Sequence, residues 1–314
     1  MEIIRGLPVS KTYRAPVVTI GNFDGVHIGH QKIIRAVVNK ASELHGTAVA
    51  MTFEPHPVRV LLPERGLKLI NSFEEKARLI ADQGIKSLIC IEFDRNFAHT
   101  DAEEFIRKII VEHLKARWIV VGHNYAFGRG KKGNASLLRR RGKKYGFGVT
   151  VVRYAKVAGG IVSSSRVRQS ITAGKVGDTA KMLGRAYYID GVVIKGAGRG
   201  NALLKTPTAN LQTDDELLPK EGVYAVRVSI GKRLYDGVAN IGRNPTFKEG
   251  RMSYEVHIFD FHENLLGQKL RLHFIGRIRD EKKFSSVEDL FDHIKMDIET
   301  ARRILKKRKT PVFV

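Results

Sequence analysis

Two short segments, far apart in the chain, carry residue types suited to binding phosphate. The first is Gly21–His30, which reads Gly-Asn-Phe-Asp-Gly-Val-His-Ile-Gly-His, and the second is Lys205–Asn210, which reads Lys-Thr-Pro-Thr-Ala-Asn. The first follows the apolar run Ala15–Ile20 and leads into a helical pattern that starts near Gln31. A strand that passes into a helix is a natural anion site, because unpaired N–H groups and the helix dipole face it. The pairing predicts two active sites on one polypeptide.

The histidines of the first segment have a spacing that suits phosphoryl chemistry. His27 and His30 lie at the start of the expected helix, where both imidazoles can point at one phosphate and stabilise the charge that builds on it. Gly25 and Gly29 allow the backbone to approach a nucleotide. An isolated His-x-Gly-His could equally be a pair of exposed histidines at a helix cap. The flanking Gly-x-Phe-Asp-Gly favours the functional interpretation.

Three further groups of polar residues could hold phosphate or a metal ion. Ser163–Arg168 offers hydroxyls at an expected N-cap and two guanidinium groups for phosphate oxygens, although alone it would be an ordinary capped helix. Thr208 and Asn210 offer the hard oxygen ligands that Mg²⁺ prefers. As a bare tetrapeptide, Pro-Thr-Ala-Asn would be only a turn. The glycine-rich loop Gly128–Asn134 could close over a nucleotide or be a surface loop.

Length and composition predict a two-domain globular protein. A chain of 314 residues with 43% apolar and 28% charged residues is long enough for two cores, and it excludes collagenous, disulfide-scaffold and broadly disordered classes. No apolar run approaches the length of a membrane span, and the N-terminus is a poor secretory signal. We therefore expect a cytoplasmic protein. The single cysteine, Cys90, lies in an apolar run and is expected to be a buried, inert thiol.

The positive charge is the one unusual bulk property. A formal net charge of +23 would attract nucleic acid, acidic membranes or phosphorylated small molecules alike. The densest basic clusters are Arg139–Lys144 and Arg302–Lys309, and neither is interleaved with the aromatic residues that a single-strand stacking platform needs. We interpret both clusters as solvated helix faces.

The alternation of short apolar runs with longer segments of helical spacing predicts an α/β domain followed by a β domain. Up to about residue 155 the pattern is that of a Rossmann-like parallel sheet with covering helices. From Tyr187 the pattern changes to short apolar runs broken by turn residues, which predicts a small antiparallel barrel. A terminal helix is expected after it. The expected strands are Val17–Ile20, Thr47–Thr52, Ser87–Ile91, Trp118–Val121 and Gly148–Val152, then Ile189–Ile194, Val223–Ser229, Leu234–Ile241, Tyr254–Phe259 and Lys269–Phe274; helices are expected from Gln31, Phe73, Ala102 and Ala135 and over Ser286–Lys307, with an apolar stripe of Val287, Leu290, Ile294, Ile298 and Ile304.

With these segments in place, the chain resembles the bacterial bifunctional riboflavin kinase/FAD synthetase family over nearly all of its length. The resemblance implies an FMN adenylyltransferase module over residues 1–183, of the His-x-Gly-His nucleotidyltransferase class, and a riboflavin kinase module over residues 184–314. The boundary falls on Leu183–Val193, which resembles the family's entry into its kinase barrel.

In the first module, the resemblance implies that His27 and His30 hold the ATP phosphates while the FMN phosphate attacks the α-phosphorus. Ser164 and Arg166 fall on a family element for phosphate binding, and Arg166 joins the histidines as a catalytic residue. Phe53, within a matching Phe-Glu-Pro-His-Pro run, is expected beside the flavin with Asn124 and Phe127; the neighbouring His123 and Tyr125 depart from the family pattern. The residues implied to bind nucleotide here are Gly21, Asn22, Phe23, Asp24, Gly25, Gly29 and Ser164.

In the second module, Thr208 and Asn210 fall on the kinase Pro-Thr-Ala-Asn signature and are implied to hold nucleotide and Mg²⁺. Glu255 is the expected general base, which takes the proton of the riboflavin 5′-hydroxyl. The glycine loop with Gly196 and Gly198 is implied to bind nucleotide, and Arg277 lies in a region that borders flavin in the family. Two departures occur: Leu203–Thr206 replaces the usual Leu-Gly-Phe lead into Pro-Thr, and Leu266 stands where tyrosine is common.

The sequence thus predicts a cytoplasmic enzyme that converts riboflavin to FMN and FMN to FAD, each with ATP and Mg²⁺, with flavins as substrates and products. It is expected to be a monomer or weak homo-oligomer, with no membrane association and no nucleic-acid partner. Two alternatives remain open. One is a monofunctional FMN adenylyltransferase with an impaired kinase, and the other is a basic nucleic-acid-binding protein on an inactive nucleotidyltransferase scaffold.

Overall fold

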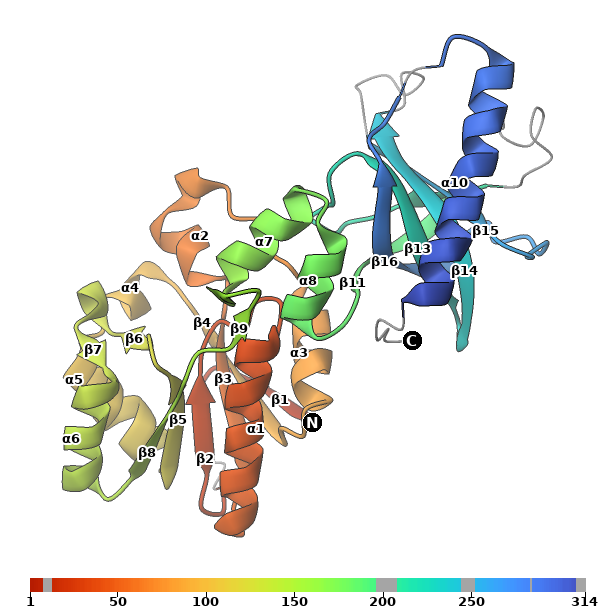
Figure 1. The fold of residues 1–314 in the computed structure, drawn as a ribbon. Helices are drawn as coiled ribbons and strands as arrows, with labels where there is room; N and C mark the ends of the chain where they lie inside the picture. The colour runs from red at the N-terminus through yellow and green to blue at the C-terminus, as the bar shows by residue number, and fades with distance from the viewer. Residues whose placement is uncertain (8–12, 196–207, 244–251, 283, 309–314) are drawn as a thin grey trace. The chain divides into compact units, whose positions relative to one another are not determined.

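The computed structural model describes residues 1–7, 13–195, 208–243, 252–282 and 284–308 (Figure 1). Its internal contacts divide the chain into two compact units, Met1–Ser164 and Ser165–Val314. The boundary that the sequence predicts between residues 183 and 184 separates catalytic modules, and it stays a prediction. Each unit is described below by itself.

The first unit is built on a six-stranded sheet with the order β1-β4-β3-β2-β5-β8, in which every neighbouring pair is parallel. The chain adds strands on one side of β2 and then, from β5 onward, on the other. The point where strand order reverses lies between β2 and β5, and ligands of open parallel sheets bind outside the carboxyl ends of the strands there. The strands are β1 (Glu2–Arg5), β2 (Val17–Ile20), β3 (Ala48–Glu54), β4 (Ser87–Glu92), β5 (Trp118–Gly122) and β8 (Gly148–Val152).

Helices cover both faces of this sheet. Successive residues of a strand point to opposite faces and enter two separate cores. Val17 and Val120 pack with α1 and α3, whereas Val18 and Val121 pack with a π-helix and α6. Because both faces are buried, the central strands are continuous apolar runs rather than alternating ones. The covering helices are α1 (Ile28–Glu43), α3 (Phe73–Ala81), the π-helix Phe105–His113 and α6 (Ala135–Tyr145).

Short elements connect this framework. Several helices begin at side chains that accept a backbone N–H, such as Ser72 before α3 and Asn134 before α6. The remaining elements are α2 (Pro57–Leu61), α4 (Arg95–Ala98), α5 (Ala102–Glu104), the 3₁₀ turns Pro63–Arg65 and Arg129–Lys131, and the two-residue strands β6 (Ala126–Phe127), β7 (Gly133–Asn134), β9 (Lys156–Val157) and β10 (Gly160–Ile161).

The second unit is a closed antiparallel barrel with the strand order β11-β12-β15-β14-β13-β16. Before it, α7 (Ser164–Thr172) leads to α8 (Val176–Leu183), which packs against β11 and β16. Closure pairs both edges of the sheet and leaves no exposed edge strand. The strands are β11 (Tyr187–Ile194), β12 (Ala209–Gln212), β13 (Gly222–Ile230), β14 (Arg233–Arg243), β15 (Met252–Ile258) and β16 (Lys269–Arg279).

A terminal helix, α10 (Val287–Lys307), packs against β13, β14 and β16 (Figure 1). Part of the predicted stripe is confirmed: Ile298 and Ile304 are partly buried against the barrel core. Ala301 and Leu305 are buried beside them, whereas Val287 is 44% exposed. Val287 was therefore wrongly assigned to the stripe, because it occupies the first turn, before the helix reaches the barrel core. Arg279 on β16 donates to the Asp297 carboxylate at 2.8 Å and fixes the middle of the helix.

The predicted fold class is confirmed, with a parallel-sheet unit, a closed barrel and a terminal helix. Within the described residues, the sequence analysis missed β1 of the sheet, β12 of the barrel and the two-residue strands β6, β7, β9 and β10. Cys90 is buried as expected, and the basic clusters of α6 and α10 lie mostly on exposed faces. Within the described ranges, every helix is too short or too polar to span a bilayer.

The packing of α10 predicts that Leu305→Ala destabilises the barrel unit. Leu305 is 2% exposed, and truncation of a buried leucine costs about 2–5 kcal/mol. Denaturant unfolding, followed by a probe in the barrel, should show a lowered midpoint. Met296 on the same helix is 61% exposed, so Met296→Ala serves as the matched control and should change stability by no more than about 0.5 kcal/mol. Equal midpoints for the two variants would contradict the assigned helix face.

Candidate functional site

The first candidate site is the turn between β2 and α1. The turn starts at the carboxyl end of β2 and ends at the N-terminus of α1. Strand β2 lies next to β5, and the strand order reverses between these two strands. The predicted segment Gly21–His30 therefore lies where an open parallel sheet binds ligands and where helix N–H groups are unpaired.

Hydrogen bonds from distant segments hold this turn. Thr52 on β3 donates its hydroxyl to the Asn22 carbonyl at 3.3 Å. The Asp24 carboxylate, 4% exposed, accepts the backbone N–H of Ile70 at 3.0 Å. The Asp24 carbonyl accepts the Ser164 hydroxyl at 2.9 Å, so two predicted nucleotide-binding residues meet. The Asp24 side chain thus contributes to the shape of the loop.

Glycine is required at two positions of the turn. Gly25 has φ of +82°, and a Cβ there would lie 2.9 Å from the Ile70 side chain. A Cβ on Gly29 would lie 3.0 Å from the imidazole ring of His27. Gly25 thus supports the turn, and Gly29 leaves room for the His27 ring to fold over the first turn of α1.

The two histidines form a stacked pair. His27 is the N-cap of α1, and its Nδ1 accepts the backbone N–H of His30 at 3.3 Å. The ring centroids of His27 and His30 are 3.7 Å apart with an interplanar angle of 14°, and the edge of Phe23 packs against His30 at 5.4 Å. The structure therefore brings together the three ring residues that the sequence predicts for this site.

The surroundings of His30 favour its neutral form. Burial lowers the pKa of His30 well below its usual value, and the nearby His27 lowers it further. In the part of the chain that the structure describes, the buried Nδ1 of His30 has no hydrogen-bond partner. Such atoms are uncommon in folded proteins, and a bound ligand is one way to satisfy them.

The predicted flavin residues of this unit belong to an aromatic row. Ring contacts run from Phe53 through Phe97 and Phe105 to Phe127 and Tyr125, at centroid distances from 5.2 to 6.4 Å. Burial raises the pKa of the Tyr125 hydroxyl far above its usual value. Asn124 lies exposed just past the carboxyl end of β5. Phe53 and Phe127 are thus linked through packed rings, while Asn124 faces solvent.

The second candidate site lies on the barrel, where strand register aligns three polar residues. Glu255 on β15 pairs with Asn210 on β12 at one side and with Asn240 on β14 at the other. Register partners project to the same face of a sheet. Ser253, two residues before Glu255, donates its hydroxyl to the carboxylate at 3.4 Å. The predicted base thus lies between two amide side chains, one of which, Asn240, the sequence analysis did not select.

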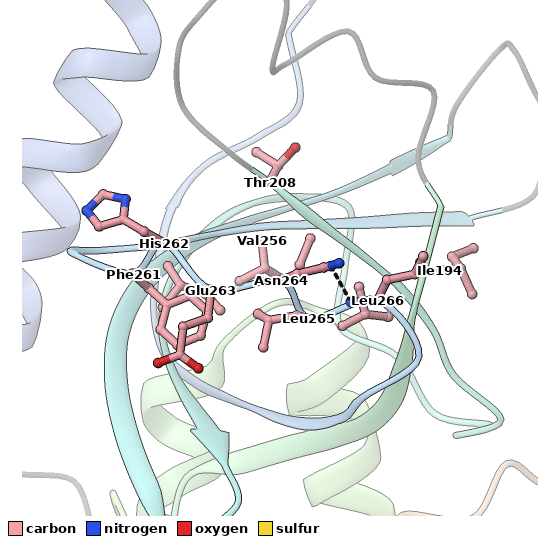
Figure 2. A pocket seen from close by; sticks show the side chains of 12 residues that line it. Ile194, Thr208, Val256, Phe261, His262, Glu263, Asn264, Leu265 and Leu266 are labelled. Carbon is pink, nitrogen blue, oxygen red and sulfur yellow. Dashed lines mark hydrogen bonds between the residues drawn. The ribbon is translucent and has the colours of Figure 1, made fainter.

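A pocket of about 380 Å³ is lined by other residues of the same strands; Figure 2 shows its lining side chains. Ala209 and Val256 line it, and the alternation of strand residues turns Asn210 and Glu255 away from it. Thr208 lies at its wall. The other lining residues include apolar Val193, Ile194, Ile258, Phe261, Leu265 and Leu266 and polar His262, Glu263 and Asn264.

Arg277 is held by several groups of the barrel unit. Its guanidinium donates to Asp280 at 2.6 Å, to the Glu221 carbonyl at 2.6 Å and to the Tyr224 hydroxyl at 3.2 Å. The hydrogen bond to Asp280 is the main cause of a raised Arg277 pKa, and the Asp280 pKa is strongly lowered in turn. Its expected flavin contact stays a prediction.

Three other predicted residues need separate mention. Gly196 and Gly198 lie outside the described residues. Arg166 lies in the first turns of α7, within the second compact unit, two residues after Ser164. Its catalytic role stays a prediction.

Comparison with known proteins gives two family matches and close relatives along the whole chain. The FAD synthetase family matches residues 9–166, and the riboflavin kinase family matches residues 183–305. The bifunctional riboflavin kinase/FMN adenylyltransferase of Escherichia coli K12 is 34% identical, covering 96% of this chain and 97% of that protein, and the one from Haemophilus influenzae is 34% identical, covering 96% and 98%. A crystal structure described as a macrolide-efflux protein from Streptococcus pneumoniae superposes with a TM-score of 0.88 at 34% identity, covering 96% of this chain and 99% of that one.

The environment of His30 predicts a neutral imidazole at neutral pH. Its ring signals in a pH titration followed by NMR should change with a midpoint below the ordinary value of about 6.5, because the buried ring disfavours the charged form. Signals that disappear in His30→Gln identify the residue. A midpoint at or above the ordinary value would contradict the described burial.

Proposed function

The chain belongs to the bifunctional riboflavin kinase/FMN adenylyltransferase family, and from this we propose that its two sites carry out one reaction each. The barrel phosphorylates riboflavin to FMN. The parallel-sheet unit transfers the adenylyl group of ATP to FMN, which gives FAD and pyrophosphate. The flavins are substrates and products, and ATP is the co-substrate of both steps. We further propose a cytoplasmic monomer or weak homo-oligomer.

In adenylyl transfer, an oxygen of the FMN phosphate attacks the α-phosphorus of ATP, and the bond between the α-phosphorus and the bridging oxygen breaks to release pyrophosphate. His27 and His30 stabilise the charge that builds on the phosphoryl oxygens, together with the N–H groups at the start of α1. The observation that supports this role best is the stacked imidazole pair at that N-terminus. No covalent enzyme intermediate is needed.

Other residues of the first unit position the substrates. The nucleotide site is bordered next to β2 by Gly21, Asn22 and Phe23. The Ser164 hydroxyl holds the loop in place by its hydrogen bond to the Asp24 carbonyl. For Arg166, which belongs to the second compact unit, a phosphate-binding role is implied by the family resemblance alone. The flavin binds to Phe53, Asn124 and Phe127. Its apolar ring system therefore lies near the aromatic row.

In riboflavin phosphorylation, the 5′-hydroxyl oxygen attacks the γ-phosphorus of ATP, its proton passes to the Glu255 carboxylate, and ADP leaves. The register that sets Glu255 between Asn210 and Asn240 supports this choice, because a carboxylate on a paired central strand is held in a fixed position. The segment Thr208–Asn210 holds the nucleotide phosphates beside Glu255, because Asn210 is the register partner of Glu255.

The kinase site also suits Mg²⁺. The Thr208 hydroxyl and the Asn210 amide oxygen are the hard oxygen ligands that this ion prefers, and Asn210 is the register partner of the acidic Glu255. When bound, the ion would neutralise negative charge on the nucleotide phosphates. Omission of Mg²⁺ is accordingly expected to stop FMN formation.

Glu255→Gln tests the kinase half. With riboflavin and MgATP, FMN formation should fall by about 10²–10⁴-fold, because glutamine cannot accept the hydroxyl proton. The same variant supplied with FMN should still make FAD at the wild-type rate. Chromatographic separation of the flavins measures both. If folded Glu255→Gln retained wild-type FMN formation, Glu255 would not be the base; wild-type protein that makes FAD only from supplied FMN would support the impaired-kinase alternative.

His30→Ala tests the adenylyltransferase half. FAD formation from FMN should fall by about 10²–10³-fold, the scale for loss of one preorganised group that stabilises transition-state charge. Riboflavin phosphorylation by the same sample is the internal control and should be unchanged. A variant that lost both activities while its circular dichroism and unfolding midpoint matched the wild type would argue against separate sites.

A further inference from the structure

A pair of exposed, stacked rings lies at the carboxyl edge of the first unit's sheet, and the proposed chemistry does not use it. The rings of His123 and Tyr154 are nearly parallel, with centroids 5.1 Å apart and an interplanar angle of 11°. His123 directly follows β5, and its N–H donates to the carbonyl of Val152, the last residue of β8, at 3.1 Å. Both rings belong to exposed residues, and Tyr154 is 39% exposed. Such a pair, at the edge where parallel sheets bind ligands, offers a flat surface to a planar ligand.

Strand pairing places His123 beside the turn between β2 and α1. Strands β2 and β5 are parallel neighbours, and their ladder ends at the pair of Thr19 and Val120. Because neighbouring strands lie about 4.8 Å apart, the turn and His123 leave the same edge of the sheet side by side. A Cβ on Gly122 would lie 3.3 Å from the Ile33 side chain of α1. The end of β5 therefore also packs against the helix whose N-terminus is the proposed phosphate site.

The segment that carries Tyr154 returns to the same helix N-terminus. The carbonyl of Ala155 accepts the N–H of Val162 at 2.9 Å, next to the β9–β10 hairpin. The Val162 carbonyl oxygen lies 4.0 Å from the Cβ position of Gly29 in the first turn of α1. The stacked pair is thus tied to the proposed phosphate site twice, through the end of β5 and through this hairpin segment.

The surroundings of the pair favour the base of ATP over the flavin as its ligand. Phe53 and Phe127, the rings implied to border flavin, pack in the core on the π-helix face of the sheet. Helix α1, to which the stacked pair is tied, covers the other face. A nucleotide with its phosphates at the N-terminus of α1 can therefore extend its base toward the pair. Asn124 is also implied to bind flavin and is the neighbour of His123, so a test must distinguish the two ligands.

We propose that the stacked rings of His123 and Tyr154 form a platform for the adenine ring of ATP in adenylyl transfer. The proposal rests on the proposed function of the first unit. Stacking of a base on an aromatic side chain changes affinity by about fivefold to 100-fold. The platform positions the base and does not touch the reacting α-phosphorus, so its loss changes the KM for ATP rather than kcat.

The test measures FAD formation from supplied FMN by full-length variants. His123→Ala and Tyr154→Ala should each raise the KM for ATP at least about fivefold and leave the KM for FMN unchanged. His123→Phe and Tyr154→Phe keep a ring and should retain most of the affinity. Ile161→Ala is the matched control, because it removes a 45% exposed apolar side chain, but no ring, from the same hairpin, and its KM for ATP should equal that of the wild type.

Inorganic tripolyphosphate separates a contact with the base from a disturbed phosphate site, because it is a phosphate chain without a base. As a competitor of ATP in FAD formation, it should inhibit the wild type and His123→Ala with the same inhibition constant. An inhibition constant that rose in parallel with the KM for ATP would overturn the proposal. The KM for ATP in riboflavin phosphorylation is the internal control of each sample and should be unchanged.

Other results would also overturn the platform. A wild-type KM for ATP in both alanine variants would show that the rings do not bind ATP. A raised KM for FMN alone would assign the pair to the flavin, and an equal loss in Ile161→Ala would show that no ring is needed. If the wild type itself made no FAD, the proposed function would fail instead, so the two failures are distinguishable.

Discussion

The first site depends on how tightly the chain turns from β2 into α1. Seven residues separate Ile20 from Ile28, and within them the backbone must reverse, bury Asp24 and present an imidazole as the helix cap. Gly25 supplies the left-handed backbone, and Gly29 leaves the space that the His27 ring fills. Since neither position tolerates a side chain without displacement, the spacing of glycine and histidine is a packing requirement. The stacked imidazoles follow from that requirement.

The second site depends on strand register. Glu255 has amide neighbours on both sides only because β12, β15 and β14 pair in one particular alignment. A shift of one residue would turn its carboxylate to the other face, where Val256 and Ala209 line the apolar pocket. Barrel closure fixes the alignment, because every strand is paired on both sides. A polar face and an apolar pocket therefore occur on opposite sides of the same strands.

The sequence predicted what depends on local pattern and missed what depends on long-range packing. The buried central strands and the His27 cap were predictable from apolar runs and from spacing. Strand β1 was missed because its residues are mostly exposed and carry no alternation, and its strand conformation comes from pairing with β4. Lys76 belongs to a helix with an amphipathic sequence pattern. That pattern does not indicate that Lys76 is buried, because its burial depends on how α3 packs near Glu54. The site roles of Arg166, Arg277 and the glycine loop stay predictions.

In the proposed function, the two sites meet the charge of ATP by different means. In the first, burial disfavours the charged form of His30, so attraction comes from the positive end of α1 and from its N–H donors. In the second, Glu255 carries the same sign as the nucleotide, and its neighbours Asn210 and Asn240 are uncharged. A carboxylate can work close to a polyphosphate only if a cation screens the two from each other, which is the physical reason for the proposed Mg²⁺ on Thr208 and Asn210. Exposed basic side chains cannot replace such a local cation, because exposed charges are screened within about 8–10 Å.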